Sequence, residues 1–222
     1  MPTERLVIFD CDGVLVDSEP LAAQAYVRTY RKHGLSIEAA VVAEGVGLKQ
    51  ADIIAKIGDI TGQYLPDDAT PDLWLETKAL FTEQLTPTPG LPAFLDALQS
   101  ARCVASSSSL ERIHHSLGVT GLAGQFGEAI FSSQMVARGK PAPDLFLLAA
   151  EKMGYAPDRC VVIEDSRFGV EGAVAAGMTA IGYTGGGHTW PGHGGTLAKA
   201  GADAICANWA DVSEELKRRG FV

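Results

Sequence analysis

The stretch RLVIFDCDGVLVDSEP, residues 5–20, decides the fold that this sequence predicts. Its first part, Arg5–Phe9, is apolar on both faces, as expected of a strand buried inside a parallel sheet. Asp10 and Asp12 follow at once, so two carboxylates are expected at the C-terminal rim of the sheet, where open α/β folds bind ligands. Close carboxylates repel each other and need a shared proton or a cation. An ordinary turn explains one Asp more easily than such a pair.

Length, composition and charge limit the classes of protein to consider. The chain has 222 residues, of which 46% are hydrophobic, enough for one large domain or for a core with an inserted lobe. The formal net charge of -9 argues against a nucleic-acid partner or an anionic membrane surface. No apolar run approaches the ~18 residues of a membrane span, and no signal-peptide pattern precedes the first strand. We expect a cytoplasmic protein, and no pattern predicts its oligomeric state.

The cysteines indicate neither a metal site nor a disulfide framework. The chain has four of them, without metal-like spacing. Cys103, Cys160 and Cys206 lie in or beside predicted buried strands, where a thiol behaves as a small apolar group. Reduced thiols, as in cytoplasmic proteins, are therefore expected.

The order of predicted elements indicates an α/β core that is interrupted by a helical segment. Between residues 17 and 87 only helices are predicted: Leu21–His33, Ile37–Glu44, Lys49–Ile57 and Pro71–Leu85. A proline-containing linker, residues 86–90, follows them. From residue 91 onward, helices alternate with strands predicted at Cys103–Ala105, Glu128–Phe131, Cys160–Ile163, Thr179–Gly182 and Ala204–Cys206.

Repeated βα units predict a parallel sheet with right-handed crossovers. The helical block falls after the first strand of that sheet. The predicted domains are therefore an α/β core, residues 1–16 and 88–222, and an inserted helical domain, residues 17–87.

A second polar segment, Ser106–Ser109, lies at the end of a predicted strand and the start of a helix. Hydroxyl groups and backbone N–H groups at a helix N-terminus form a site for an anion. A plain serine N-cap is the alternative interpretation. The segment alone does not decide between the two.

A third segment holds Lys140 between Gly139 and Pro141, just ahead of a predicted helix. A lysine confined in this way is poorly placed to be a flexible surface charge. Surface lysines are nevertheless common, so both interpretations stay open at this point.

A fourth segment places Glu164 and Asp165 at the end of a predicted buried strand. Adjacent carboxylates again need compensation, and their oxygens favour a hard cation such as Mg²⁺. Asp165 or Ser166 could instead simply cap the next helix, and capping can coexist with metal binding.

Together these segments resemble the four motifs of the haloacid dehalogenase-like (HAD) superfamily, in its β-phosphoglucomutase and phosphoglycolate-phosphatase-like branch. They read DCDGVLVDSE from residue 10, SSSS from residue 106, GKPAPD from residue 139 and VIEDSRFG from residue 162. All four occur in order, each at a predicted strand end or adjoining loop. The resemblance implies a Rossmann-like parallel-sheet core with an inserted all-helical cap.

The resemblance also implies a Mg²⁺-dependent phosphatase acting on a small phosphorylated metabolite, such as a sugar phosphate, as in the 6-phosphogluconate-phosphatase-like members. Asp10 would attack phosphorus and form an aspartyl-phosphate, and Asp12 would act as general acid and base. The metal would be bound by the Asp10 side chain, the Asp12 main-chain carbonyl and the pair Glu164 and Asp165. Glu164 would bind it directly or through water.

The remaining implied site residues would hold the substrate. Ser106 and Lys140 would bind the phosphoryl group, with Ser107 and Ser108 supplying a backbone N–H or a supporting hydroxyl. Gly45–Lys49 resembles the specificity loop of the cap, in which Lys49 would meet a distal anionic group or be a solvated lysine. Glu19 would face the cleft or serve only as an acid at a helix start.

Two other functions compete with this one. Phosphomutases of the β-phosphoglucomutase type carry a histidine near the start of the first cap helix, where alignment places Ala22 in this chain. A non-enzymatic phosphometabolite-binding protein would be expected to have lost one of the reacting groups. The glycine-rich segment Gly185–His193 is not a dinucleotide fingerprint, and we expect a surface connection or a loop near the cap with His188 or Trp190 touching substrate.

Overall fold

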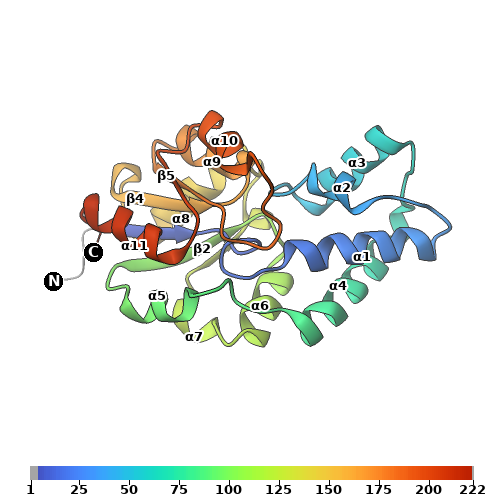
Figure 1. Cartoon of the computed structure of the whole chain (residues 1–222), viewed down its shortest axis with the longest axis horizontal. Coiled ribbons are helices and arrows are strands. Elements are labelled where there is room, and N and C mark those ends of the chain that lie inside the picture. Colours follow the sequence, from blue (N-terminus) through green and yellow to red (C-terminus); the bar gives the residue numbers. More distant parts are fainter. Residues whose placement is uncertain (1–4, 222) are drawn as a thin grey trace.

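The computed structural model describes residues 5–221 and, within them, one six-stranded sheet of order β3-β2-β1-β4-β5-β6 (Figure 1). Every neighbouring pair of strands is parallel. The strands are β1 (Leu6–Phe9), β2 (Ala101–Ser106), β3 (Ile130–Ser132), β4 (Cys160–Glu164), β5 (Thr179–Tyr183) and β6 (Ala204–Cys206). The predicted fold class, a Rossmann-like parallel sheet, is confirmed.

The position of β1 in the middle of the sheet brings the polar segments together. Strand β1 pairs with β2 on one side and with β4 on the other, so that Phe9 lies opposite both Val104 and Ile163. Parallel strands end at the same edge. The residues that follow Phe9, Val104 and Ile163 therefore emerge side by side at the C-terminal rim.

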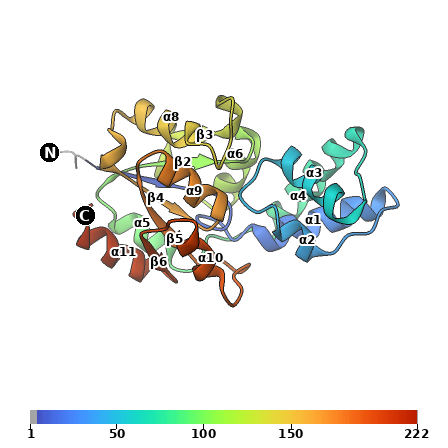
Figure 2. The same ribbon diagram turned by 90° about the horizontal axis from the view of Figure 1, so that it is seen from above.

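Helices cover both faces of the sheet, because alternate residues of a strand point to opposite faces. Val7 and Phe9 belong to one hydrophobic cluster and Leu6 and Ile8 to another. The first cluster is covered by α5 (Leu91–Ala97), α6 (Leu110–Val119), α7 (Ala123–Phe126) and α11 (Trp209–Arg218). The second is covered by α8 (Asp144–Met153), α9 (Arg167–Ala175) and α10 (His193–Lys199). Figure 2 shows these strands and helices from a second direction.

A helical lobe extends from the C-terminal rim of the sheet (Figure 1). It consists of α1 (Glu19–Lys32), α2 (Ala39–Ala43), α3 (Gln50–Thr61) and α4 (Thr70–Gln84). Its helices share a hydrophobic cluster that contains Tyr26, Tyr30, Leu73 and Leu80. The domain boundaries at residues 17 and 87 stay a prediction, which this separate cluster supports.

Two antiparallel segments join the lobe to the sheet. The Asp17 N–H donates to the Thr86 carbonyl (3.0 Å), and the Thr88 N–H donates to the Leu15 carbonyl (3.1 Å). Val16 and Pro87 form an isolated antiparallel bridge between these bonds. The two crossings between lobe and core are therefore held together at one place.

The structure differs from the sequence-based prediction where local composition was misleading. Helix α2 is shorter than the predicted Ile37–Glu44, and the four-residue α7 is too short to produce a periodic pattern. Helix α10 begins at His193 and contains Gly194 and Gly195, which disfavour a helix. Packing of Leu197 in the core stabilises it all the same.

The expectations for the cysteines and for membrane spans can also be compared with the structure. All four cysteines are buried and unpaired, as expected for reduced thiols. Across residues 5–221, every helix is too short or too polar to cross a membrane.

Replacing Thr88 with the isosteric Val will destabilise the protein by removing one hydroxyl that serves two partners. This hydroxyl donates to the Val14 carbonyl (2.6 Å) and accepts from the Trp209 indole N–H (3.0 Å), and Thr88 is 1% exposed. Each buried polar group left unpaired costs about 1–3 kcal/mol, so we expect the free energy of unfolding to fall by about 2–4 kcal/mol. Urea unfolding with an unchanged slope measures this loss.

Thr82→Val is the matched control, because the Thr82 hydroxyl is exposed, and water can replace its contacts with the Lys78 carbonyl (2.8 Å) and His115 Nε2 (3.1 Å). We expect it to change stability by no more than about 0.5 kcal/mol. Equal losses in the two variants would show that the two buried hydrogen bonds of the Thr88 hydroxyl do not stabilise the protein.

Candidate functional site

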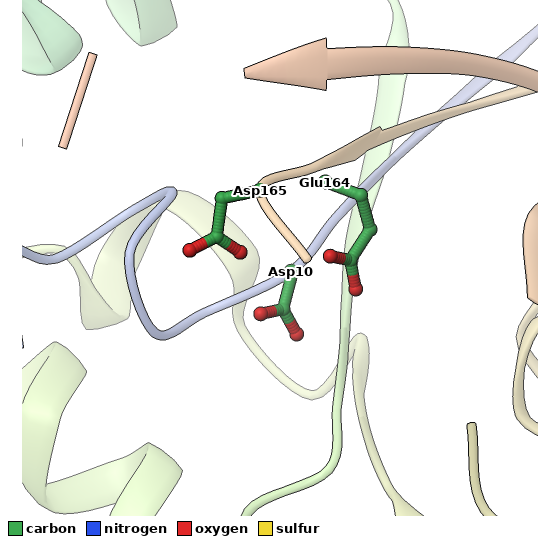
Figure 3. A group of neighbouring side chains, drawn as sticks. All are labelled: Asp10, Glu164 and Asp165. Carbon is green, nitrogen blue, oxygen red and sulfur yellow. The ribbon is translucent and has the colours of Figure 1, made fainter. Parts of the chain in front are cut away.

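Three buried carboxylates meet at the rim of the sheet (Figure 3). Asp10 follows β1, Glu164 is the last residue of β4, and Asp165 comes next. One oxygen of each lies within 4.8 Å of one oxygen of the others. So many negative charges in one dry place must be compensated by cations or protons.

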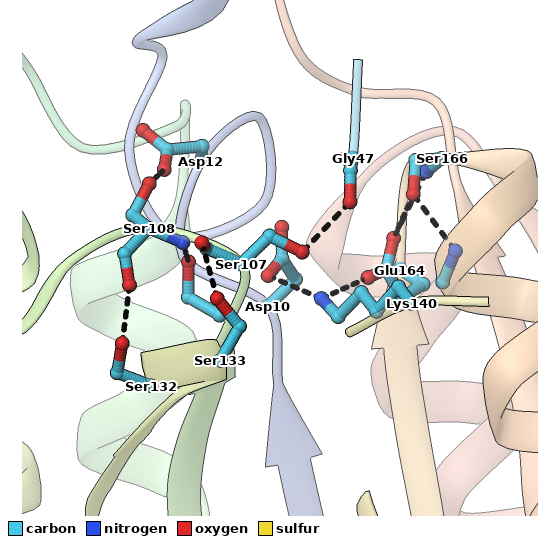
Figure 4. A network of polar contacts seen from close by, with 12 residues as sticks. Asp10, Asp12, Gly47, Ser107, Ser108, Ser132, Ser133, Lys140, Glu164 and Ser166 are labelled. Atoms are coloured by element: carbon cyan, nitrogen blue, oxygen red, sulfur yellow. Dashed lines mark hydrogen bonds and ion pairs between the residues drawn. The ribbon is translucent and has the colours of Figure 1, made fainter. Parts of the chain in front are cut away.

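Lys140 supplies one of these cations. Its buried ammonium donates to Asp10 Oδ1 (2.7 Å) and to Glu164 Oε1 (2.5 Å), as Figure 4 shows. Burial alone would lower the pKa of Lys140, but the charges of Asp10 and Glu164 outweigh it and raise that pKa, so the amine stays protonated. Lys140 therefore lies in the site and not on the surface.

One ammonium does not neutralise three carboxylates. Burial raises the pKa of Asp10 well above its ordinary value, because Lys140 only partly opposes burial and the charges of Glu164 and Asp165 add to it. The Asp165 Oδ2 atom lies 2.9 Å from His188 Nε2, so a second basic side chain reaches the cluster. Three carboxylates against at most two positive charges still leave a negative set of hard oxygen atoms, which fits a divalent cation.

Two glycines of the motifs make room for these carboxylates. A Cβ atom on Gly13 would overlap Asp165 Oδ2, and Gly13 also has a positive φ of +74°. A Cβ atom on Gly169 would overlap the Glu164 carboxyl group. The glycines of the first and fourth motifs are thus required sterically by the acidic cluster.

Both carboxylate oxygens of Glu164 accept hydrogen bonds from the protein. Its Oε1 accepts from Lys140, and its Oε2 accepts from the N–H (3.0 Å) and the hydroxyl (2.9 Å) of Ser166. Ser166 also caps α9, because its hydroxyl accepts from the Gly169 N–H (3.0 Å). The capping interpretation thus holds for Ser166, while Asp165 belongs to the acidic cluster.

Asp12 points away from this cluster and is held by three donors. Its Oδ1 accepts from the Ser18 hydroxyl (2.6 Å) and from Arg112 Nη2 (2.7 Å), and its Oδ2 accepts from the Ser108 hydroxyl (2.6 Å). Burial would raise the pKa of Asp12, but the charge of Arg112 and the hydrogen bonds outweigh burial and lower it. Asp10 and Asp12 thus lie in opposite electrostatic environments only two residues apart.

The serine segment links the core to the helical lobe. The buried Ser106 hydroxyl accepts from the Ser108 N–H (3.1 Å). The Ser107 hydroxyl donates to the Gly47 carbonyl (2.7 Å), which belongs to the lobe (Figure 4). Ser109, and not Ser106, is the N-cap of α6, since its hydroxyl accepts from the Arg112 N–H (3.3 Å).

A cavity of about 490 Å³ lies between the core and the lobe. Asp10, Asp12, the four serines and Arg112 line it from the core. From the lobe it is lined by Glu19, Ala22, Tyr26, Gly47, Lys49 and Trp74. The structure therefore brings every substrate-site residue expected from the sequence to one cavity, with Lys140, Glu164 and Asp165 behind Asp10.

Glu19 and Lys49 both lie in the cavity wall. This is the position required if Glu19 faces the cleft and if Lys49 meets a distal group of the substrate. Burial raises the pKa of Glu19 to about 7, reinforced by the charges of Asp12 and Asp165. Lys49 packs against Gly139, where a Cβ atom would overlap its side chain. Both side chains are positioned where a bound molecule would meet them.

The loop that follows β5 was expected to be a surface connection, but the structure places part of it against the acidic cluster. His188 Nε2 lies 2.9 Å from Asp165 Oδ2, and the His188 side chain is only 10% exposed. His193 Nε2 lies 2.7 Å from the Asp165 main-chain carbonyl. The surface interpretation is wrong for both histidines, whereas Trp190 is 45% exposed and stacks on His193.

The approach of this loop depends on its glycines and on one contact with the core. The Gly187 N–H donates to Asp17 Oδ1 (2.8 Å), and a Cβ atom on Gly186 would lie 2.8 Å from the Gly13 carbonyl oxygen. In the sequence, a run of glycines indicates only a loop. No residue pattern predicts that this loop lies so close to Gly13 and Asp17.

Arg112 is a second residue that sequence analysis did not single out. It contacts Asp12 across 100 positions of the chain and stacks on the Phe81 ring, with 5.0 Å between the guanidinium carbon and the ring centroid. In the sequence it is one charged residue on an amphipathic helix, a pattern that is typical of a solvated face.

Comparisons with known proteins agree with this geometry. The sequence profile of haloacid dehalogenase-like hydrolases matches residues 4–177. The chain belongs to this family. It is 31% identical over 174 residues to 6-phosphogluconate phosphatase of Escherichia coli K12, covering 78% of this chain and 79% of the relative. It is 36% identical over 178 residues to hexitol phosphatase A of the same organism, covering 78% and 80%.

Solved structures of HAD hydrolases share the whole architecture. A HAD family hydrolase from Deinococcus radiodurans R1, solved with bound phosphate and sodium, is 32% identical and superimposes with a TM-score of 0.79. The match covers 100% of this chain and 99% of the other. The predicted family is confirmed, and the similarity extends over both the sheet and the helical lobe.

The pair of His188 and Asp165 will make the stability of the metal-free protein depend on pH. Burial would lower the pKa of His188, but Asp165 raises it from 6.5 to about 9. Stability from the charged pair is therefore fully present below pH 6.5 and is lost as the pH rises through about 9. In a chelating buffer, we expect His188→Gln to flatten the fall in melting temperature over this window.

His114→Gln is the control for this measurement, because His114 is an exposed residue of the same type on α6. It is expected to leave the pH profile as in the unmodified protein. The assignment fails if the His188 and His114 variants have the same pH profile.

Proposed function

We propose that this protein is a Mg²⁺-dependent phosphatase that hydrolyses a small sugar or polyol phosphate through an aspartyl-phosphate on Asp10. The observation that carries the proposal is the position of Asp10 in the cavity wall, with Lys140 bound to its Oδ1 (2.7 Å). The names of the relatives, 6-phosphogluconate phosphatase and hexitol phosphatase A, support phosphorylated polyols as the substrate class. The phosphate bound in the Deinococcus hydrolase supports a phosphoryl site.

The proposed reaction has two displacements at phosphorus. In the first, a carboxylate oxygen of Asp10 forms a bond to phosphorus while the bond to the leaving oxygen breaks. Asp12, which is ionised in the free protein, takes up a proton when the anionic ester binds beside it and gives that proton to the leaving oxygen. In the second, water attacks phosphorus, Asp12 accepts the proton of the water, and the bond to Asp10 breaks. Asp12 is thereby protonated again for the next leaving group, and the sum is hydrolysis of one ester.

The other polar residues near Asp10 are proposed to stabilise the charge of the phosphoryl group. Phosphoryl transfer depends mainly on positioning and on stabilising charge at the phosphoryl oxygens. We assign this role to Lys140, to the Ser106 hydroxyl and to backbone N–H groups of the serine segment. Ser107 and Ser108 then have supporting roles, one through its bond to Gly47 and the other through its bond to Asp12.

The acidic cluster fits a divalent cation, and we propose Mg²⁺. The Asp10 and Asp165 side chains and the Asp12 main-chain carbonyl would hold it. Glu164 would take part through water, because Lys140 and Ser166 already engage its oxygens. When bound, Mg²⁺ would reduce the repulsion between the anionic nucleophile and the phosphate.

The helical lobe is proposed as a cap that closes over the substrate. Lys49 and Glu19 would contact the leaving group from this cap. A closed lid excludes water and strengthens electrostatic interactions inside the cavity. We also propose a cytoplasmic location, which the four free thiols support.

Hydrolysis is preferred over mutase chemistry because of what lines the cavity. Ala22 is in the wall and is 3% exposed, and no histidine is among the described residues that line this cavity. No imidazole is therefore available there to assist capture of a sugar hydroxyl. Product analysis with a β-hexose 1-phosphate separates the functions, because hydrolysis releases inorganic phosphate and mutase chemistry yields a hexose 6-phosphate.

Asp10→Asn will abolish Mg²⁺-dependent release of phosphate, because an amide oxygen is a poor nucleophile. We expect kcat/KM for the best substrate from a screen of phosphorylated metabolites to fall about 10⁴-fold. A phosphate-release assay with and without Mg²⁺ measures the loss. Asp158→Asn, at an exposed position far from the rim, is the control and should keep full activity. Undiminished turnover by Asp10→Asn would refute the assignment.

A further inference from the structure

We infer that Arg112 is a specificity-determining residue that binds a hydroxyl group of the leaving alcohol, on the carbon next to the ester carbon. The inference rests on the proposed function, since only an ester substrate has a leaving alcohol. Arg112 belongs to none of the four motifs by which the chain resembles its family. Its position in the cavity wall carries the argument.

The contact of Arg112 with Asp12 fixes where the guanidinium lies. Arg112 Nη2 donates to Asp12 Oδ1 at 2.7 Å. In the proposed reaction Asp12 transfers a proton to the bridging oxygen of the ester. A hydroxyl on the neighbouring carbon lies about one hydrogen-bond length from that oxygen. Arg112 is therefore placed to reach this hydroxyl while Asp12 faces the bridging oxygen.

Arg112 also has donors that the protein does not use. A guanidinium has five N–H donors, and Arg112 Nε is buried without a hydrogen-bond partner among the described residues. The side chain as a whole is 16% exposed and lines the cavity, so a ligand oxygen can reach the guanidinium there. The Phe81 ring beneath the guanidinium holds its plane in place, at 5.0 Å from the guanidinium carbon.

The charges around Arg112 favour a hydroxyl over a carboxylate. Asp12 and Glu19 act on the guanidinium strongly enough to raise its pKa against the effect of burial. A substrate carboxylate brought here would be repelled by these two acids. A hydroxyl is both donor and acceptor, so it can accept from Arg112 and donate to Glu19. The pair Arg112 and Glu19 thus suits a polyol.

A purely structural role for Arg112 makes a different prediction. If Arg112 only holds Asp12 in place, its loss slows every ester equally, because every ester needs Asp12. If Arg112 binds the neighbouring hydroxyl, its loss affects only esters that carry this hydroxyl. Two substrates that differ in this one group therefore separate the two roles.

The test compares a hexitol 6-phosphate with its 5-deoxy analogue, which lacks the hydroxyl beside the ester carbon. A site built to bind a hydroxyl discriminates strongly against an analogue without it. We expect the unmodified protein to prefer the hexitol phosphate at least about tenfold in kcat/KM. Arg112→Met should reduce that ratio to about two or less, by losing activity on the hexitol phosphate more than on the analogue.

Two further variants keep the comparison interpretable. Arg112→Lys retains a cation beside Asp12 but lacks the planar set of guanidinium donors, so the ratio should fall even if the Met variant folds poorly. Arg28→Met is the matched control, because the exposed Arg28 pairs with Glu76 (2.8 Å) and is not part of the cavity wall. Its ratio should equal that of the unmodified protein.

A binding measurement separates failure of this inference from failure of the proposed function. Calorimetry with the Asp10→Asn protein should give about tenfold weaker binding of the hexitol phosphate when Arg112→Met is added, and no change for the deoxy analogue. Equal loss on both ligands, in rate and in binding, would overturn the inference and leave the phosphatase intact. Absence of phosphate release by the unmodified protein would overturn the proposed function, while the binding comparison would still decide the role of Arg112.

Discussion

The buried Lys140 ammonium, bound to Asp10 and Glu164, is the interaction on which the rest of this structure depends. Without it, the three buried carboxylates would have only His188, beside Asp165, as a nearby basic group. Charges in such a place are stable only when they are paired. The lysine supplies one charge, so the cluster stays negative and is suited to a divalent cation as well. The same contact thus stabilises the folded protein and holds the proposed nucleophile.

The sheet topology is what makes this contact possible. Strand β1 between β2 and β4 brings Asp10, the serine segment and Glu164 to one edge, although they are far apart in the chain. Gly13 and Gly169 remove the side chains that would occupy the space of the carboxylates. The same loop then carries Asp12 to the other side, where Arg112 and two serine hydroxyls lower its pKa. One short loop thus holds two carboxylates in opposite environments. Mg²⁺ bound at Asp10 would lower the pKa of the proposed nucleophile, and an anionic phosphate beside Asp12 would raise the pKa of the proposed acid.

Much of the site was readable from the sequence because its residues follow buried strands. Asp10, Ser106 and Glu164 each come at a strand end, and parallel strands end at a common edge. The fold class follows from the alternating helices and strands for the same reason. These signals are local in the chain, and the topology turns them into a common position in space.

The residues that sequence analysis missed are those whose partners lie far away in the chain. Arg112 reads as one more charge on an amphipathic helix, and only the folded chain brings it to Asp12. His188 lies in a glycine run that reads as a loop, and only the packing of that loop against Gly13 and Asp17 brings the histidine to Asp165. Helix α10 was missed because its glycines disfavour a helix, which packing of Leu197 overrides.

The central claim is that Asp10 carries the phosphoryl group during turnover, and trapping that species tests it most directly. Borohydride reduces an acyl phosphate to an alcohol, so an aspartyl-phosphate at residue 10 becomes homoserine. A reaction of the unmodified protein with its best substrate and Mg²⁺, quenched during turnover and reduced, is digested and analysed by mass spectrometry. We expect homoserine at position 10 only when substrate is present. Homoserine at another acidic residue, or at none while phosphate is released, would contradict the account.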